Sequence, residues 1–336
     1  MASFIFETIT PDQAAAFQPG DSLTFTSGSA GLARVAFGVD GAAVTMGDRT
    51  ITFGAGILGK VAGLADGGAL FVGTPNADNV AVGAASAAFF GGLGDDLLNG
   101  GPVNDLLQGN QGADVLNGGP GSDTLFGGQD NDVINAGAGA DEHNFVNGNR
   151  GDDTIVGANG GDILLGGQGH DNITGGTGAD LILGNLGDDT INGGGGADTI
   201  QGGGGYDIMS GGGGSVLFVF EQDSSVIDFQ RSDRILDWNP GDHIHLPVSG
   251  GFGAVEATAP APPTMPYGGY APVDDFTTAQ TAAANAFANN GALKIVAAQG
   301  GSDVDVFVDL NGDHVIDMAI ILSNTTLASV SEGNFV

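Results

Sequence analysis

A large aliphatic residue recurs at every ninth position through the middle of the chain. One apolar residue in nine is too few for an amphipathic helix, and the strict alternation of an ordinary strand is missing as well. The pattern instead predicts a flat spiral of short strands and tight turns, in which stacked coils bury a ladder of aliphatic side chains. These positions are Leu98, Leu107, Leu116, Leu125, Ile134, Ile155, Leu164, Ile173, Ile182, Ile191, Ile200 and Met209.

Around this ladder the chain repeats the nonapeptide GGxGxDxUx, where U is the aliphatic residue. The segments GGLGDDLLN from position 91, GGPGSDTLF from 118 and GGQGHDNIT from 166 are examples. Six residues, GGxGxD, must reverse the chain, and glycine supplies the positive φ angles that such a turn needs. The repeat occurs thirteen times, with its sixth-position acid at Asp96, Asp105, Asp114, Asp123, Asp132, Asp141, Asp153, Asp162, Asp171, Asp180, Asp189, Asp198 and Asp207.

Two repeats make one coil of 18 residues, so alternate acids stack along the same edge. Asp96, Asp114 and Asp132 would share one edge, while Asp105, Asp123 and Asp141 would share the other. Coils stack at the strand spacing of about 4.8 Å, where like charges repel. A hard cation that prefers oxygen ligands resolves this conflict, and Ca²⁺ is the expected ion.

These repeats resemble those of the RTX family, the hemolysin-type calcium-binding repeat proteins. The resemblance implies an all-β chain with a right-handed parallel β-roll over residues 91–216. It also implies that each ion lies between two same-edge turns, for example with the carbonyls of Gly92 and Gly94 beside Asp96, and those of Gly109 and Gln111 beside Asp114.

Counting same-edge neighbours predicts about nine calcium ions. Four lie in a first block (96/114, 114/132, 105/123, 123/141) and five in a second (153/171, 171/189, 189/207, 162/180, 180/198). They would bring the formal charge from −33 to about −15, so calcium binding is expected to be coupled to folding. A disordered glycine-rich linker or a collagen-like tract is the alternative, but the acidic and aliphatic positions hold their phase throughout.

Three irregularities interrupt the repeat. Residues 136–147 span twelve positions instead of nine, which places His143 at the eighth position and divides the roll into two blocks. This is either a tolerated loop insertion or a bulge that presents Glu142, His143 and Arg150 to a partner. Val103 and Asp130 replace fourth-position glycines and predict distorted turns or weaker sites. The last repeat ends the array at Val216.

Composition excludes several classes of function. The chain has 40 acidic and 7 basic residues and no cysteine, so nucleic acid is a poor partner, and disulfides and thiolate metal sites are excluded. The first ten residues lack a basic region and a long apolar run, and no stretch reaches the length of a membrane helix. We therefore expect no membrane insertion, and export by a signal other than an N-terminal signal peptide.

The flanking segments predict smaller elements. Residues 1–72 contain five short β-like runs (22–26, 34–39, 43–46, 50–53 and 69–72) and one helical turn at 11–17, which predicts a small β domain for capping and assembly. Residues 73–90 are degenerate lead-in turns, in which Asp78 either starts the array or only makes a turn.

Residues 217–336 predict a β-rich cap with one helix at 274–290 and strands at 294–298, 304–309 and 315–322. The segments 232–246, 303–321 and 332–336 resemble the C-terminal domain of serralysin-type RTX proteins, which type I secretion machinery exports through an uncleaved C-terminal signal.

Three features of the C-terminal part have two interpretations each. Asp309, Asn311, Asp313 and Asp317 resemble the start of an EF-hand loop or form a plain Asn-Gly hairpin turn. His243 and His245 are a zinc pair or ordinary strand residues. The Pro/Tyr-rich segment 259–272 is a passive loop or a contact arm for a neighbouring molecule.

No motif of a catalytic domain occurs, since H-E-x-x-H, G-x-S-x-G and a phosphate loop are all missing. The sequence therefore predicts a non-enzymatic, calcium-dependent structural protein of the bacterial cell surface or extracellular space. It would self-assemble as a homopolymer in a surface layer, filament or matrix, with the cell surface or a polysaccharide as partner. A secreted adhesin or carbohydrate-binding protein is the second hypothesis, and a secreted hydrolase the third.

Overall fold

The computed structural model describes residues 2–28, 33–38, 41–81, 85–139, 142–221, 232–246, 255–258, 275–289, 295–300, 302–311, 313 and 315–336. The chain forms two compact units, residues 1–172 and 173–336, and each is described by itself. The domain boundaries expected from the sequence stay a prediction.

The first unit begins with a small β region built around phenylalanines. Phe6, Phe17, Phe25 and Phe53 are buried there, and Phe17 meets Phe53 edge to face at 5.5 Å. The short helix α1 begins with a capping box between Thr10 and Gln13. The elements are β1 (Ser3–Ile5), α1 (Pro11–Ala15), β2 (Ser22–Thr24), the antiparallel sheet of β3 (Ala33–Gly38), β4 (Gly41–Met46) and β5 (Arg49–Gly54), the 3₁₀ turn η2 (Ala55–Ile57), β6 (Lys60–Gly63) and β7 (Ala69–Val72).

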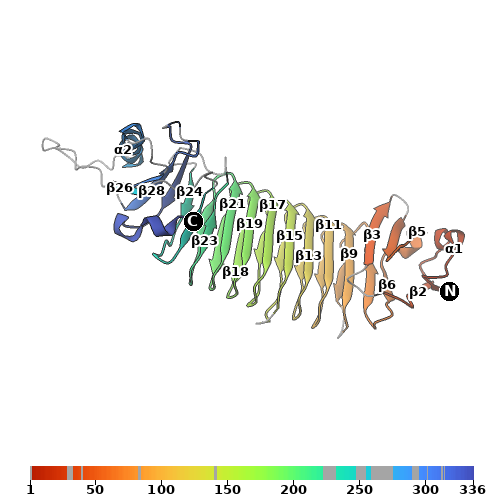
Figure 1. Ribbon diagram of the computed structural model, residues 1–336. Helices are drawn as coiled ribbons and strands as arrows, with labels where there is room; N and C mark the ends of the chain where they lie inside the picture. Colours follow the sequence, from red (N-terminus) through yellow and green to blue (C-terminus); the bar gives the residue numbers. More distant parts are fainter. Residues whose placement is uncertain are drawn as a thin grey trace. The chain divides into compact units, whose positions relative to one another are not determined.

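The rest of the first unit alternates between two parallel sheets, so that each coil contributes one strand to each sheet. One sheet continues from β7 through β9 (Ala87–Leu93), β11 (Leu106–Gln111), β13 (Thr124–Gln129), β15 (Phe145–Arg150) and β17 (Ile163–Gln168) (Figure 1). The other contains β8 (Asn79–Ala81), β10 (Leu97–Asn99), β12 (Val115–Asn117), β14 (Val133–Asn135) and β16 (Thr154–Val156).

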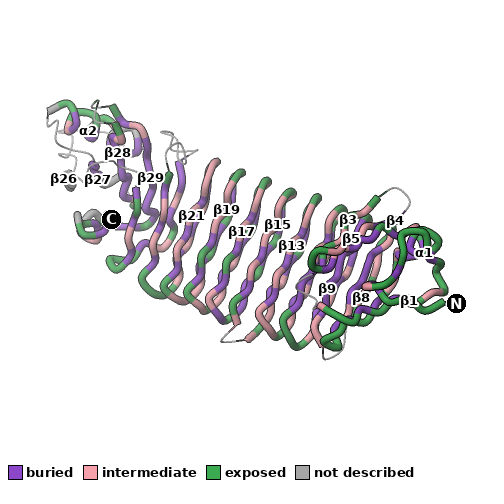
Figure 2. Tube along the Cα trace, turned by 45° about the vertical axis from the view of Figure 1, so that its right-hand side comes forward, coloured by how far each residue is buried: buried purple, intermediate pink, exposed green. Residues whose placement is uncertain are grey.

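The register of these sheets confirms the predicted parallel roll. Leu98 faces Leu116, which in turn faces Ile134, and Leu107 faces Leu125. All five side chains are fully buried, and buried stretches alternate with more exposed ones along the coils in Figure 2. The strand pairing also includes β8 and β9, so residues 79–81 and 87–93 already belong to the two sheets.

We expect Leu125→Ala to lower the free energy of unfolding by roughly 2–5 kcal/mol, because a cavity would remain between two fixed coils. Urea denaturation of the calcium-loaded protein measures this loss. Thr124→Ala in the same strand is the matched control, since Thr124 is only half-buried and should cost about 0.5 kcal/mol or less. Equal effects of the two substitutions would contradict the buried ladder.

The second unit contains two parallel sheets of the same kind. One runs in the order β19 (Leu181–Leu186), β21 (Thr199–Gly204), β23 (Leu217–Val219) and β25 (His243–His245). The other contains β18 (Asn172–Gly176), β20 (Thr190–Gly194), β22 (Ile208–Ser210) and β24 (Asp233–Ile235). The parallel pairing continues beyond Val216, where the sequence predicts the end of the repeats, because β23 pairs in parallel with β25, and β22 with β24.

The second sheet then continues into the C-terminal β structure. Its strands are β29 (Met318–Leu322), which is parallel to β24, and then β28 (Asp303–Val308), β27 (Ile295–Gly300) and β26 (Val255–Thr258). Helix α2 (Asp275–Asn289) contributes Phe276 and Phe287 to a core that also contains Phe307 and Ile321. The chain ends with the 3₁₀ turns η3 (Leu327–Ser329) and η4 (Glu332–Asn334).

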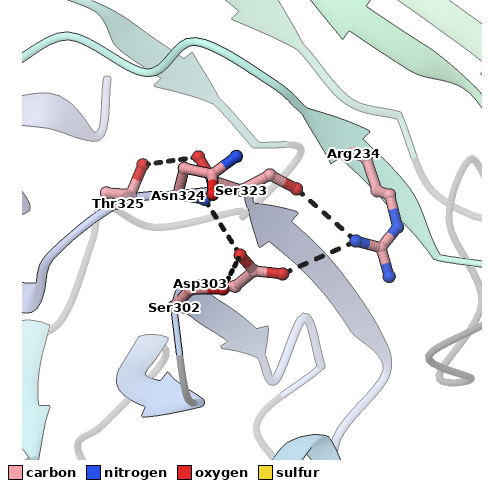
Figure 3. A network of polar contacts seen from close by, with 6 residues as sticks. All are labelled: Arg234, Ser302, Asp303, Ser323, Asn324 and Thr325. Atoms are coloured by element: carbon pink, nitrogen blue, oxygen red, sulfur yellow. Dashed lines mark hydrogen bonds and ion pairs between the residues drawn. The ribbon is translucent and has the colours of Figure 1, made fainter.

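Polar contacts fasten this C-terminal structure to β24 (Figure 3). The Arg234 guanidinium lies 3.6 Å from the Asp303 carboxylate and 3.5 Å from the Ser323 hydroxyl, and Asp303 also accepts the Asn324 N–H at 2.9 Å. Since both ionic groups are largely buried, the contact fixes the position of β28 and β29 against the last coil.

The helix expected at 274–290 is confirmed over 275–289, and the three C-terminal strands over 295–300, 303–308 and 318–322. The Pro/Tyr-rich segment 259–272 lies outside the described residues. Among the residues that are described, no helix is long and apolar enough to cross a membrane.

Candidate metal centre

The sixth-position aspartates lie in two rows, as the repeat predicts. In each row the Oδ1 atom of one aspartate accepts the backbone N–H of the corresponding residue one coil earlier. The N–H of Asp96 donates to Asp114 and that of Asp114 to Asp132, both at 2.8 Å, and in the other row Asp105 donates to Asp123 at 2.7 Å. The spacing between these partners is 18 residues, so each hydrogen bond joins two neighbouring turns.

In many of these aspartates the second carboxylate oxygen is buried without a hydrogen-bond donor. Burying a charged group without a partner costs far more than folding can tolerate. These buried carboxylate oxygens therefore need a cation as their partner. The aspartates whose Oδ2 atom is in this state include Asp96, Asp105, Asp114, Asp123, Asp132, Asp153, Asp198 and Asp207.

Burial changes the acidity of these carboxyls in the metal-free chain. The pKa of Asp132 is raised to about 8, because loss of water and the charges of Asp153 and Asp114 together outweigh the lowering effect of a backbone hydrogen bond. Burial likewise raises the pKa of Asp96 and Asp123 to about 7. Without a cation, the ionised row is therefore unfavourable at neutral pH.

The first glycine of each turn makes room for the second carboxylate oxygen. A β-carbon on Gly91 would overlap Oδ2 of Asp96, and it would also lie 2.7 Å from the carbonyl oxygen of Gly109 in the next coil. Gly109 and Gly127 stand in the same relation to Asp114 and Asp132. Oxygens of two turns thus converge on the space that the missing side chain leaves.

Backbone carbonyls must supply most ligands of any ion held here. Within the described ranges, no three His, Cys, Asp or Glu side chains come together as a metal-binding group. A site made of one or two carboxylates and several carbonyls suits Ca²⁺, which takes six to eight oxygens in flexible geometry. The donor set therefore fits calcium, with the row aspartates and turn carbonyls as its holders.

In the twelve-residue repeat, the residues that take the row position and the eighth position differ from the sequence prediction. Asn144, not Asp141, takes the row position after Asp123, whose N–H donates to Asn144 Oδ1 at 2.8 Å. Val146 faces Leu125 and is fully buried, so the assignment of His143 to the eighth position is wrong. Asp141 itself lies outside the described residues.

The insertion also leaves the other row continuous. The N–H of Asp132 donates to Asp153 Oδ1 at 2.8 Å across 21 residues, and β14 pairs with β16 without a break. The predicted division into two blocks is therefore wrong on this edge, because the insertion lies between β14 and β15 and leaves the pairing of β14 with β16 intact.

The side chains around the insertion contact the roll itself. Glu142 Oε2 accepts the N–H of Gly139, and the His143 ring nitrogen Nδ1 shares a hydrogen bond with the carbonyl oxygen of Gly161, both at 2.7 Å. Their presentation to a partner, together with Arg150, stays a prediction.

The two fourth-position replacements behave differently. Asp130 keeps the left-handed conformation of the glycine it replaces, with φ of 75°, so its turn retains the common shape. Val103 has no positive φ, so its turn lacks the left-handed residue that most turns have at this position, and a weaker site there stays a prediction.

Two further aspartates continue the rows beyond the predicted array. Asp207 donates its N–H to Asp233 Oδ1, and Val216 donates to Asp242 Oδ1, both at 3.0 Å. Sequence reasoning missed them because glycine-rich turns do not precede them. The signal that remained was the triplet of an acid, any residue and an aliphatic residue, at Asp233 to Ile235 and Asp242 to Ile244.

The remaining C-terminal candidates are held by local contacts. Asp317 Oδ2 accepts the N–H of Leu310 at 2.7 Å, which closes the turn between β28 and β29. The Nδ1 atom of His245 lies 2.8 Å from the carbonyl oxygen of Val336. Neither contact tests the EF-hand or zinc interpretations, and Gly312 and His314 lie outside the described residues.

Comparison with known proteins agrees with this geometry. The pattern of the RTX calcium-binding nonapeptide repeat (4 copies) matches 73–107, 90–125, 108–142, 143–173, 165–200 and 183–215. Residues 73–215 are thus RTX calcium-binding repeats, a class typical of secreted proteins. A search of curated proteins found no match.

Solved structures of similar proteins include two subunits of a mannuronan C5-epimerase from Azotobacter vinelandii. The AlgE6R3 subunit is 24% identical, with 52% of this chain and 78% of that chain covered and a TM-score of 0.27. The AlgE6R2 subunit is 21% identical, with 54% and 91% covered and a TM-score of 0.28. The extracellular lipase LipA from Serratia marcescens is 16% identical, with 63% and 40% covered and a TM-score of 0.25. TM-scores this low carry no weight for the function of this chain.

Proposed function

We propose that this protein is a non-enzymatic, calcium-dependent structural protein that works outside the cell and self-assembles there. The observation that carries the proposal is the pair of rows of buried carboxylate oxygens without donors. Such rows are stable only where calcium is abundant, and free Ca²⁺ is scarce inside cells but reaches about millimolar levels outside, where sites of modest affinity fill. Folding would therefore follow export, for which type I secretion is the expected route.

Calcium would be held by the row aspartates together with backbone carbonyls of their turns. A bound ion would supply the positive charge that the Oδ2 atoms lack. The other aspartates predicted from the sequence are retained as proposed calcium ligands. Asp162 is left out because its Oδ2 atom accepts the N–H of Ala158, and Asp141 because Asn144 takes the row position. The number of ions, about nine from the sequence, stays part of the proposal.

An open sheet edge supports self-assembly. Among the described residues, β1 pairs with β2 alone. The hydrogen bonds to β2 come from alternate residues, since Phe6 N donates to Thr24 O and Ala2 O accepts from Ser22 N. The N–H of Ser3 therefore points away from β2, and an unpaired edge of this kind is a template for a strand of another copy.

Electron microscopy and light scattering with and without calcium test this proposal. We expect ordered polymers only with calcium, and we expect Ser3→Pro to reduce them because it removes the outward N–H. Ser3→Ala is the matched control, since both variants lose the contact between the Ser3 and Ser22 hydroxyls and only one loses the donor. A calcium-loaded protein that stays monomeric at all concentrations would refute self-assembly.

A second candidate function is binding of a polysaccharide. A hollow on the first unit is lined by Arg34 and Arg150, two of the seven basic residues of the chain, together with Gln108, Asn110 and Phe126. Amides, guanidinium groups and an aromatic ring suit a polar or acidic sugar chain. A glycan array that gives binding in the wild type but not in Arg150→Ala would favour this function.

A further inference from the structure

The backbone conformation of the second residue distinguishes two of the repeat turns from most of the rest. In most turns this residue has a positive φ, either as glycine or as asparagine, for instance Gly92 at 110°, Gly119 at 98° and Asn149 at 76°. Asparagine tolerates this region better than other residues with a β-carbon. Thr74 and Ala158 occupy the same position in their turns, and neither has a positive φ.

The backbone N–H of these two residues points into the turn. Thr74 donates to Oδ2 of Asp78, and Ala158 donates to Oδ2 of Asp162, both at 2.7 Å. In the turns of Asp96, Asp123 and Asp153 the same carboxylate oxygen receives no donor. A main-chain N–H thus takes the place at Oδ2 where the other turns need a cation.

Contacts with the preceding coil also leave no space for an ion at the turn of Asp162. Asp162 Oδ1 accepts both the N–H and the side-chain amide of Asn144, at 2.8 and 3.0 Å. Asn144 brings no charge, and the first position of its own turn is Ala136 instead of glycine. The space that a first-position glycine provides for a carboxylate oxygen elsewhere is therefore filled by a side chain.

We propose that the second residue of each turn decides whether the turn binds calcium, and that the turns of Asp78 and Asp162 bind none. A residue in the left-handed region turns its N–H away from the carboxylate and leaves Oδ2 for the ion. A residue outside that region donates its N–H to Oδ2 and replaces the ion. The proposal rests on the row aspartates being the calcium ligands, and it revises the assignment of Asp162 to them.

Two pairs of substitutions test this rule. Asn149→Ala should close the turn of Asp153, because alanine disfavours the left-handed region, and should lose at least one calcium ion or weaken it at least tenfold. Asn149→Gly is its control, since it loses the same side-chain contact with Asn147 but keeps the conformation. Ala158→Gly should gain at least one ion, whereas Ala158→Ser should not.

The readouts are the number of bound ions by native mass spectrometry and the folded fraction by circular dichroism at saturating calcium. The rule is overturned if Ala158→Gly binds as many ions as wild type, or if Asn149→Ala and Asn149→Gly bind equally well. If Asn149→Ala fails to fold, the pair at position 158 decides alone. These counts do not depend on polymer formation, so failure of self-assembly would leave the rule standing. A wild type without bound calcium would instead refute the ligand assignment.

Discussion

Removal of calcium at about pH 7.5 is expected to unfold the roll. Each row brings ionised carboxylates one coil apart, and the second oxygens of residues such as Asp96, Asp114 and Asp132 are buried without donors. Once the ions leave, burial penalises every charge, and the carboxylates of neighbouring turns repel one another. Far-UV circular dichroism during titration with a chelator should show loss of the β signal, and added calcium should restore it.

Magnesium is the control for this prediction. Mg²⁺ is smaller, demands octahedral geometry and gives up its waters reluctantly, so millimolar Mg²⁺ should restore little of the β signal. A second control is high salt, which screens exposed charges but acts weakly on buried ones and should also fail. A complete β signal in chelator, without any divalent ion, would contradict the role of calcium in folding.

The regular part of this fold could be predicted from the sequence, because each repeat contains the residues that determine its own turn and strand. Each aliphatic residue faces its equivalent one coil away, as Leu98 faces Leu116, so the nine-residue period alone determines the register. The row aspartates follow from the same period, and their burial was predictable from their place at the end of a turn.

The period did not predict what happens where turns change length. Counting forward placed Asp141 in a row and His143 at the eighth position of the repeat, whereas counting back nine residues from Asp153 gives Asn144 as the row residue, which the structure confirms. Nothing in the local sequence decides between these two counts, because only the pairing of β15 with β13 and β17 fixes the frame. Asp233 and Asp242 were missed for the related reason that their turns lack the repeat glycines.

Acidification is expected to stabilise the metal-free protein instead of unfolding it further. The aspartates of the rows have raised pKa values in the folded, metal-free state, about 8 for Asp132 and about 7 for Asp96, Asp123 and Asp153, against an ordinary 3.8. The folded chain therefore binds more protons than the unfolded chain between these values. Its stability rises as the pH falls from about 8 towards 4, because protonation removes the buried charge.

The folded fraction of the metal-free protein, followed by circular dichroism at a series of pH values, measures this effect, because the roll that is unfolded near pH 8 should regain its β signal as the pH falls. We expect the free energy of unfolding to increase by several kcal/mol between pH 8 and pH 5, since each unit of pKa shift is worth about 1.4 kcal/mol and several aspartates contribute. The calcium-loaded protein should behave in the opposite way, because protons compete with the ion for the same oxygens.

Asp132→Asn separates this mechanism from a general effect of net charge. Asparagine keeps an oxygen that can accept the N–H of Asp114, but it carries no charge to neutralise. The metal-free variant should therefore be more stable than the wild type at pH 8, similar to it at pH 5, and weaker in calcium binding. If the variant kept the full pH dependence of the wild type, the Asp132 carboxyl would contribute nothing to it, and the raised pKa of this residue would not be part of what makes the metal-free chain sensitive to pH.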